Sequence, residues 1–177
     1  DCTLLEHQYG FRPFRGRSHA TCVLQRIIDS AGTLPEGLYA LYIDLEQAFD
    51  RVPRRRLWRV LRKRGLPTRF VRLLRDLYSN TQGHVKSEHM LGEWFKVTCG
   101  VRQGSVEGPL LFNIYMDTMM RDVLHRCPNA GIRLHYRIDG RWVDTSEMDH
   151  EAIIACLLYA DDAALLARSE QELQHLY

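Results

Sequence analysis

This sequence lacks paired cysteine motifs and long apolar runs, and each absence excludes a class of protein. The 177 residues include five cysteines, scattered singly and without a Cys-x-x-Cys pair. An odd, dispersed set argues against a disulfide framework or a zinc site and is typical of free thiols in a reducing compartment. We therefore expect an intracellular protein, in the nucleus or the cytoplasm. No run is long enough to cross a bilayer and no secretory signal is visible, so we expect no membrane partner.

Acidic side chains are absent from residues 51–75, although the whole chain has a net charge of only +2. Pro53 suits the first turn of a helix and Gly65 suits its end, so a helix is predicted between them and a second from Pro67. A run of charge is usually a solvated helix face. An excess this large on consecutive helices favours contact with nucleic-acid phosphates, which positions the nucleic acid without reading its sequence. We assign that contact to Arg54, Arg55, Arg59 and Arg62.

The remaining elements follow from periodicity and turn residues. Helices are predicted over residues 18–30 and 109–125. Hairpins are predicted from the segments 84–89 and 94–98, and from 132–138 and 141–143 around an Asp-Gly turn. The chain therefore mixes helices with antiparallel strands.

Three carboxylates stand at the ends of short apolar runs that have the length of buried strands. The pair Asp161–Asp162 lies between Ile153 to Leu158 and Ala163 to Ala167, at the tip of a predicted hairpin. Asp44 ends a third run, Leu38 to Ile43. If the three strands share one sheet, the acids converge and could hold two metal ions about 3.5–4 Å apart, the arrangement used for nucleotidyl transfer. On the hairpin alone, a solvated Asp-Asp turn is an equally good interpretation.

Four stretches resemble the sequence boxes of reverse transcriptases, and they occur in that family's order. They are similar to a fingers box, the first aspartate box, a glutamine-glycine box and the signature box: Gln8 to Pro13 with Gly16 to Ser18, Ile43 to Val52, Gly100 to Ser105 with Pro109 to Asn113, and Tyr159 to Asp162. The residues of these boxes are most similar to those of the non-LTR (LINE-type) retrotransposon branch, with group II intron reverse transcriptases as near relatives.

The resemblance implies an α+β fold with the right-hand architecture of polymerases. An antiparallel palm sheet would carry the acids, with helices packed on one face. Residues 1–177 would form one reverse transcriptase domain fragment. Residues 1–37 and 52–100 would form the fingers and palm-flanking helices, and residues 38–51 and 101–177 the palm. The thumb is missing, and we expect it in the remainder of a longer retroelement polyprotein, with or without an endonuclease.

The implied activity is that of an RNA-directed DNA polymerase, which joins dNTPs to the 3′-hydroxyl of a DNA primer on an RNA template. By this resemblance Asp44, Asp161 and Asp162 would be catalytic. Together with the carbonyl of Leu45 they would bind two Mg²⁺ ions, for which Mn²⁺ could substitute. The incoming nucleotide would be bound by Arg12, Phe49, Gln103 and Gly104. The ring of Phe49 would exclude a 2′-hydroxyl, or it is simply a core side chain.

Two boxes depart from the family pattern: Phe14 is an extra residue in the fingers box, and the glutamine-glycine box of the family usually continues Gln-Gly-Cys-x-x-Ser-Pro. Here Ser105 replaces the cysteine, Gly108 replaces the serine, and Glu107 brings a negative charge. Two other functions stay open. The first is a non-enzymatic nucleic-acid binder derived from a retroelement copy, against which the retained carboxylates argue. The second is another palm enzyme, such as a nucleotidyl cyclase or a DNA-templated polymerase, which the fingers box and the Tyr-Ala-Asp-Asp wording disfavour.

Overall fold

Helices and antiparallel strands alternate along the chain in a computed structural model that describes residues 4–32, 37–87, 90–136 and 150–177. The predicted α+β class is confirmed. The chain divides into two compact units. Unit 1 contains Asp1–Leu4 and Glu46–Tyr115, and unit 2 contains Leu5–Leu45 and Met116–Tyr177.

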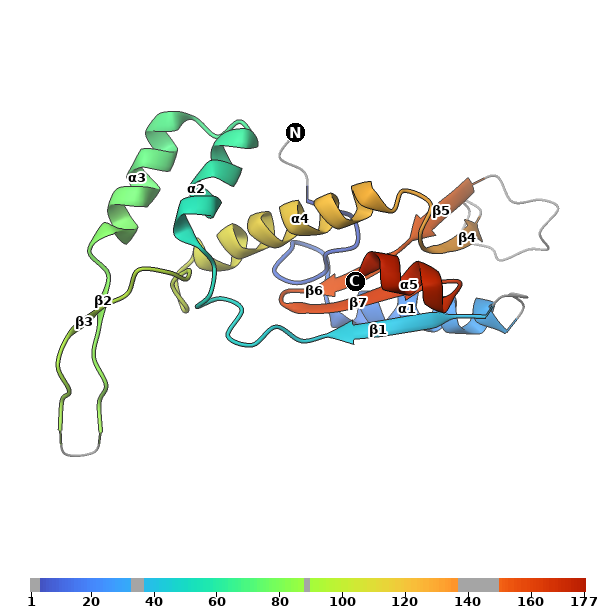
Figure 1. Cartoon of the computed structure of the whole chain (residues 1–177), viewed down its shortest axis with the longest axis horizontal. Helices are drawn as coiled ribbons and strands as arrows, with labels where there is room; N and C mark the ends of the chain where they lie inside the picture. Colours follow the sequence, from blue (N-terminus) through green and yellow to red (C-terminus); the bar gives the residue numbers. More distant parts are fainter. Residues whose placement is uncertain (1–3, 33–36, 88–89, 137–149) are drawn as a thin grey trace. The chain divides into compact units, whose positions relative to one another are not determined.

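A three-stranded antiparallel sheet forms the centre of unit 2 (Figure 1). Its strand order is β1-β7-β6, where β1 is Tyr39–Ile43, β6 is Cys156–Tyr159 and β7 is Asp162–Ala167. Strands β6 and β7 form the predicted hairpin, and β1 pairs with the outer side of β7 over all five of its residues. The prediction that the strand before Asp44 joins the hairpin in one sheet is therefore confirmed.

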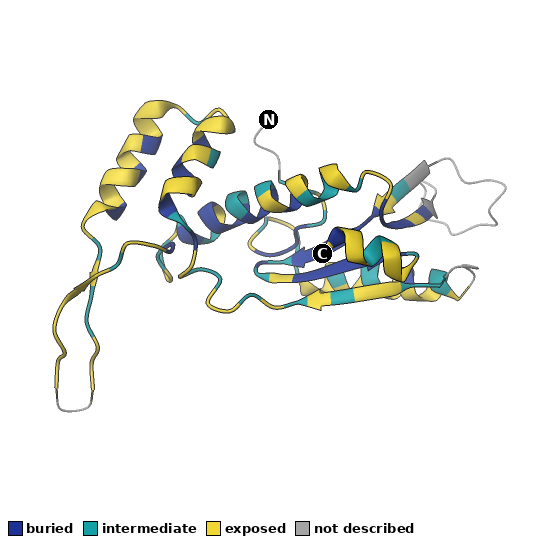
Figure 2. Cartoon of the chain, in the orientation of Figure 1, coloured by how far each residue is buried: buried dark blue, intermediate teal, exposed yellow. Residues whose placement is uncertain are grey.

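Both faces of this sheet are covered, so the prediction of helices on one face is wrong. Helix α1 (Arg17–Ala31) packs on the face that carries Leu157, Ala164 and Leu166. Helix α5 (Glu170–Leu176) and the second half of α4 (Gly108–Arg126) pack on the opposite face. Strands β6 and β7 are almost wholly buried as a result (Figure 2). A strand in which every residue is apolar is typically buried on both faces of its sheet. The residues after Asp162, from Ala163 to Ala167, are all apolar in this way.

The apolar run Ile153 to Leu158 is not one strand, as the sequence suggested. It breaks at Ala155 into β5 (His150–Ile154) and β6, and β5 pairs with β4 (Ile132–Tyr136) in a separate two-stranded sheet. Gly131 lies against the break with a φ of 120°, and a Cβ there would come within 2.8 Å of the Ala155 nitrogen. The segment 141–143, predicted as the partner of residues 132–138, lies outside the described residues.

Unit 1 contains the two basic helices, α2 (Arg54–Lys63) and α3 (Thr68–Ser79), which begin and end close to the predicted proline and glycine positions. The predicted hairpin that follows is reduced to β2 (Gln82–Gly83) and β3 (Phe95–Lys96). Most of the described residues between Gln82 and Lys96 are exposed (Figure 2).

Within the described part of the chain, none of the helices combines the length and the apolar character needed to cross a membrane. The four cysteines in that part, Cys22, Cys99, Cys127 and Cys156, are free thiols. Burial raises the pKa of the Cys156 thiol to about 12, which keeps it protonated and unreactive.

Candidate active site

Asp44 and Asp162 stand opposite each other at one end of the central sheet. The register pairs Ile43 with Ala163, so the next residue of β1, Asp44, comes level with Asp162 at the start of β7. On its other side Asp162 pairs with Tyr159, which closes the hairpin around Ala160 and Asp161. The fold thus brings residues separated by more than a hundred positions to the same edge.

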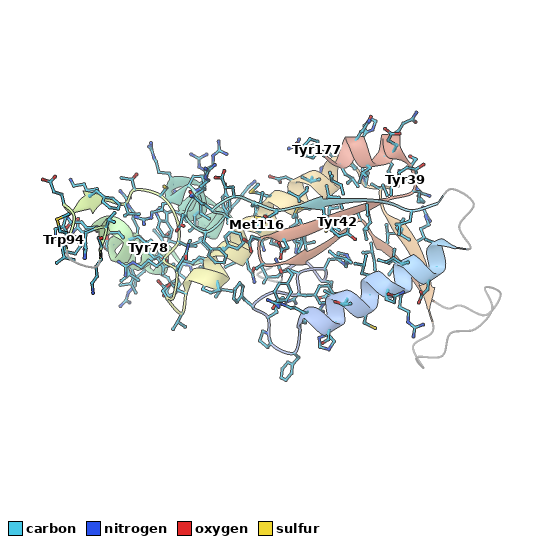
Figure 3. All side chains as sticks on the ribbon, turned by 90° about the horizontal axis from the view of Figure 1, so that it is seen from below. Tyr39, Tyr42, Tyr78, Trp94, Met116 and Tyr177 are labelled. Atoms are coloured by element: carbon cyan, nitrogen blue, oxygen red, sulfur yellow. The ribbon has the colours of Figure 1, made fainter. Side chains whose placement is uncertain are left out.

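The side chains of Asp44 and Asp162 belong to the sheet face that α1 covers. Tyr42 pairs with Ala164, and alternation along each strand puts Asp44 and Asp162 on that same face. Both acids line a cavity of about 390 Å³ together with Tyr42 and Tyr159. Figure 3 labels Tyr42 on β1. The cavity is mostly apolar, and the carboxylates are the acidic groups that line it.

Asp161 occupies the turn itself. Its side chain is half-buried, whereas those of Asp44 and Asp162 are exposed. Adjacent carboxylates repel each other, and access to water makes the pair tolerable. Ala160, just before them, has a φ of 57°, in the left-handed region. This conformation costs a residue with a Cβ about 1 kcal/mol or more, so other contacts must hold the turn.

Oxygen ligands are what a hard divalent cation requires, and this edge of the sheet supplies them. Among the residues that the structure describes, no three His, Cys, Asp or Glu side chains are close enough together to bind an ion. Mg²⁺ does not require such a group, because it is commonly held by one or two carboxylates, water and substrate phosphates. Asp44 and Asp162, which line the same cavity, fit that requirement, whereas Asp161 lies in the adjoining turn and does not line this cavity.

The residues predicted to bind a nucleotide fall in both units. In unit 1, Phe49 stacks on Phe112 with a centroid distance of 4.1 Å, and the Gln103 amide donates to the Asp50 carboxylate at 2.9 Å. Two backbone hydrogen bonds, from Gly100 N–H to the Val52 carbonyl and from Val101 N–H to the Phe49 carbonyl, tie these segments together. Gly104 has a φ of 79° in the turn that follows.

Arg12 and Leu45 belong to unit 2. The Arg12 guanidinium donates to the carbonyls of Leu5 at 2.7 Å and Gln8 at 3.2 Å, so in this structure it holds the N-terminal loop. Leu45 follows Asp44 directly, so its backbone carbonyl is adjacent in sequence to the Asp44 carboxylate.

A sequence model of the family described as reverse transcriptase (RNA-dependent DNA polymerase) matches residues 2–177. The chain belongs to the reverse transcriptase family. The predicted resemblance to retrotransposon reverse transcriptases is confirmed as well.

Two relatives illustrate the match. The Pol polyprotein of the type-1 retrotransposable element R2 from Nasonia vitripennis is 30% identical over 90% of this chain. A probable RNA-directed DNA polymerase from transposon BS of Drosophila melanogaster is also 30% identical, over 94% of the chain. The chain spans only 14% and 16% of the lengths of these two proteins.

A solved structure shares the fold at low identity. Apo telomerase from Candida tropicalis, truncated from its C-terminal domain, superposes with a TM-score of 0.51 over 96% of this chain and 31% of its own. The identity is 14%, so the match bears on the fold alone.

The departures from the reverse transcriptase box at residues 105–108 have structural causes. A Cβ on Gly108 would lie 2.4 Å from the Arg102 carbonyl oxygen, so a serine does not fit this backbone. Ser105 donates to that same carbonyl at 2.9 Å and accepts from the Gly108 N–H at 3.1 Å. Glu107 accepts a hydrogen bond from the Tyr78 hydroxyl at 3.2 Å. Partial burial opposes ionisation, but hydrogen bonds from its own backbone, Ser105 and Tyr78 leave the pKa of Glu107 lowered.

Arg54 requires a correction, because it is buried rather than presented to nucleic acid. Only 9% of the residue is exposed, and its guanidinium donates to three carbonyls: those of Tyr78 at 2.9 Å, Val97 at 2.8 Å and Gly100 at 2.8 Å. It also lies over the Tyr78 ring at 5.0 Å from the centroid; Figure 3 labels this tyrosine. Arg55, Arg59 and Arg62 are exposed, as a phosphate contact requires.

Two residues of the site region escaped the sequence analysis. Tyr78 joins α2, α3 and the loop around Arg102, and it looked like an ordinary helix residue. Gln8 contacts the turn at Ala160 through its side chain. Its position inside the fingers box was the available signal, but sequence periodicity does not reveal a buried glutamine.

Proposed function

We propose that the chain is the catalytic core of an RNA-directed DNA polymerase, which joins dNTPs to the 3′-hydroxyl of a DNA primer on an RNA template. The observation that carries this proposal is the position of Asp44 level with Asp162, with Asp161 in the adjoining turn, in a chain of the reverse transcriptase family. The sheet of unit 2 would be the palm. The division into fingers at residues 1–37 and 52–100 and palm elsewhere stays a prediction, as does the location inside the cell.

The carboxylates of Asp44, Asp161 and Asp162, with the carbonyl of Leu45, would bind two Mg²⁺ ions. When bound, these ions would lower the pKa of the primer 3′-hydroxyl and balance the charge of the leaving pyrophosphate. Asp44 and Asp162 are exposed, so their oxygens can share a cation with substrate phosphates.

Primer extension on a primed RNA template, with Mg²⁺ and dNTPs, tests the proposal. A chain that also includes a thumb domain is compared with its Asp161→Ala Asp162→Ala twin. Extension by the parent and none by the twin supports both the activity and the site. Binding of primer-template without extension by either would instead favour a nucleic-acid binder without turnover.

Phe49→Val is expected to admit ribonucleotides, raising the ratio of rNTP to dNTP incorporation by at least about tenfold. One large ring excluding a 2′-hydroxyl contributes a discrimination of roughly 1–3 kcal/mol. Single-nucleotide extension with matched dNTP and rNTP concentrations measures the ratio. The substitution also removes the stack on Phe112, so the melting temperature should fall.

Phe112→Leu is the matched control, because Phe112 is the other ring of that stack and is 1% exposed. It should lower the melting temperature and leave sugar discrimination unchanged. If Phe49→Val behaves in the same way, Phe49 is a packing residue and has no part in choosing the sugar.

Arg54 and Arg59 are expected to separate stability from nucleic-acid binding. Arg54→Met removes a donor from three inward-facing carbonyls, of which only that of Tyr78 is known to keep another, the Thr81 hydroxyl at 3.1 Å, and should destabilise the fold by about 2–4 kcal/mol. Arg59→Met on the exposed face should leave stability within about 0.5 kcal/mol, weaken binding to primer-template and reduce the salt slope by about one. Urea unfolding and binding isotherms at several salt concentrations measure both. A normal salt slope for Arg59→Met would remove this helix from the nucleic-acid interface.

A further inference from the structure

The segment Gln8 to Gly10 forms a fourth line of backbone along the β6 edge of the central sheet. Gln8 makes an isolated parallel bridge with Leu158. The Leu158 N–H donates to the His7 carbonyl at 2.9 Å, and the Tyr9 N–H donates to the Leu158 carbonyl at 2.8 Å. This segment therefore reaches the hairpin that carries Asp161 and Asp162 from the side away from β1.

The Gln8 side chain satisfies both backbone groups of Ala160. Its Oε1 accepts from the Ala160 N–H at 3.0 Å and from the Gly10 N–H at 2.8 Å, while its Nε2 donates to the Ala160 carbonyl at 3.3 Å. Only 1% of Gln8 is exposed. A buried amide is costly unless hydrogen-bonded, and here it is bonded through both its donor and its acceptor.

Gly10 allows this arrangement because its Cα packs directly on the turn. A Cβ at this position would lie 2.3 Å from the Ala160 nitrogen and 3.1 Å from the Tyr159 carbonyl carbon. Ala160 is in the left-handed region, which disfavours any residue with a side chain. The hydrogen bonds from Gln8 and the close packing of Gly10 hold the turn in that conformation.

The conformation of Ala160 determines where the two acids point. Asp161 is the next residue, and Asp162 starts the strand that runs beside β1. A different φ at Ala160 would rotate the Asp161 carboxylate relative to Asp44. A ligand set must be held within about 0.5 Å and 10–20° of its working geometry by the groups behind it.

We infer that Gln8 is a positioning residue, which fixes the turn at Ala160 and so sets the geometry of the carboxylates that would bind Mg²⁺. This inference rests on the proposed function for the role of the carboxylates, but the clamp itself is a property of the fold. Gln8 is buried behind the turn, so it is assigned a positioning role and not a catalytic one. The groups behind a metal ligand typically change metal affinity or activity by 10–100-fold when they are replaced.

Gln8→Met tests the inference, since methionine has a similar length and no amide. Gln25→Met is the matched control, because Gln25 is exposed on α1 and its side-chain amide donates to the Asp29 carboxylate at 2.9 Å. Mn²⁺ binding to the 177-residue chain, followed by electron paramagnetic resonance of the free ion, should weaken about tenfold in Gln8→Met and stay unchanged in the control. In the thumb-bearing chain kcat should fall by 10–100-fold, with KM for primer-template within about twofold.

Amide hydrogen exchange separates the inference from the proposed function. Exchange at residues 160–162 should accelerate about tenfold or more in Gln8→Met, while the β1–β7 ladder keeps its protection. Faster exchange in Gln8→Met than in the parent, together with no primer extension by the parent, would refute the proposed function and leave the role of Gln8 at the turn standing. A folded Gln8→Met with parental Mn²⁺ affinity and kcat would refute the positioning role, provided that Asp161→Asn abolishes both.

Gln8→Glu keeps the test decisive if Gln8→Met does not fold. Ionised glutamate retains an acceptor for the N–H groups of Gly10 and Ala160 but loses the donor to the Ala160 carbonyl, so exchange is measured above the pKa of this buried carboxyl. In Gln8→Glu we expect a smaller loss of Mn²⁺ affinity than in Gln8→Met and partial protection of the amides of the turn. Parental exchange at residues 160–162 in this variant would overturn the inference.

Discussion

Asp161→Asn is expected to reduce kcat for primer extension by about 10³-fold or more, with the chain still folded. Asparagine has the shape of aspartate but lacks the charge that would attract the cations, and loss of one electrostatic contact to a transition state typically costs 10²–10³-fold or more. Asp44→Asn should behave alike, because Asp44 comes level with Asp162 in the next strand. Single-turnover extension of a primed RNA template measures the loss.

Stability should move in the opposite direction. The two adjacent carboxylates of the turn repel each other, so Asp161→Asn should leave the melting temperature unchanged or raise it by a few degrees. Asp122→Asn is the control, since Asp122 is exposed on α4 in the same unit and should change neither quantity. The double variant Asp44→Asn Asp161→Asn should be no slower than either single variant, because residues that act as one unit are not additive. Unfolding of Asp161→Asn, or retention of a tenth of the parental activity, would contradict the metal-site role.

The sequence was sufficient for the elements that bear the candidate site. Each strand is a short apolar run with an acid at or close to one of its ends, and burial of such runs favours their pairing in one sheet. Turn residues and prolines placed the helix boundaries of α2 and α3 within a few positions. These features are local, so they are visible in the order of residues.

The missed features depend on partners far away in the chain. Arg54 follows Pro53 in a basic run, and its burial is decided by carbonyls up to 46 residues away. Gln8 is 152 residues from Ala160, and its role appears only when the N-terminal segment lies along β6. The break at Ala155 is likewise set by Gly131. A polar or basic side chain is most often solvated, so sequence alone favours the exposed interpretation.

Gly100→Ala is expected to cause the largest loss of stability, about 3 kcal/mol or more. Gly100 has a φ of 81°, which costs alanine about 1–2 kcal/mol. Its Cβ would also lie 2.7 Å from the Asp50 carbonyl oxygen and 2.8 Å from the Asp50 Cα. Those are backbone atoms, so they cannot rotate away, and an overlap of this kind adds about 1–3 kcal/mol. Urea unfolding followed by far-UV circular dichroism measures the change.

Gly65→Ala separates the two causes. Gly65 has nearly the same φ, 84°, with nothing within 4 Å of the position of its Cβ. It should lose only the conformational part, about 1 kcal/mol. Equal losses at the two glycines would mean that the contact between Gly100 and Asp50 is not formed. A larger loss at Gly100 has a functional consequence. The Gly100 N–H donates to the carbonyl of Val52, two residues after Asp50, and the Asp50 carboxylate accepts a hydrogen bond from the Gln103 amide. A partly folded Gly100→Ala should therefore bind dNTP more weakly than Gly65→Ala at equal folded fractions, which equilibrium titration can measure.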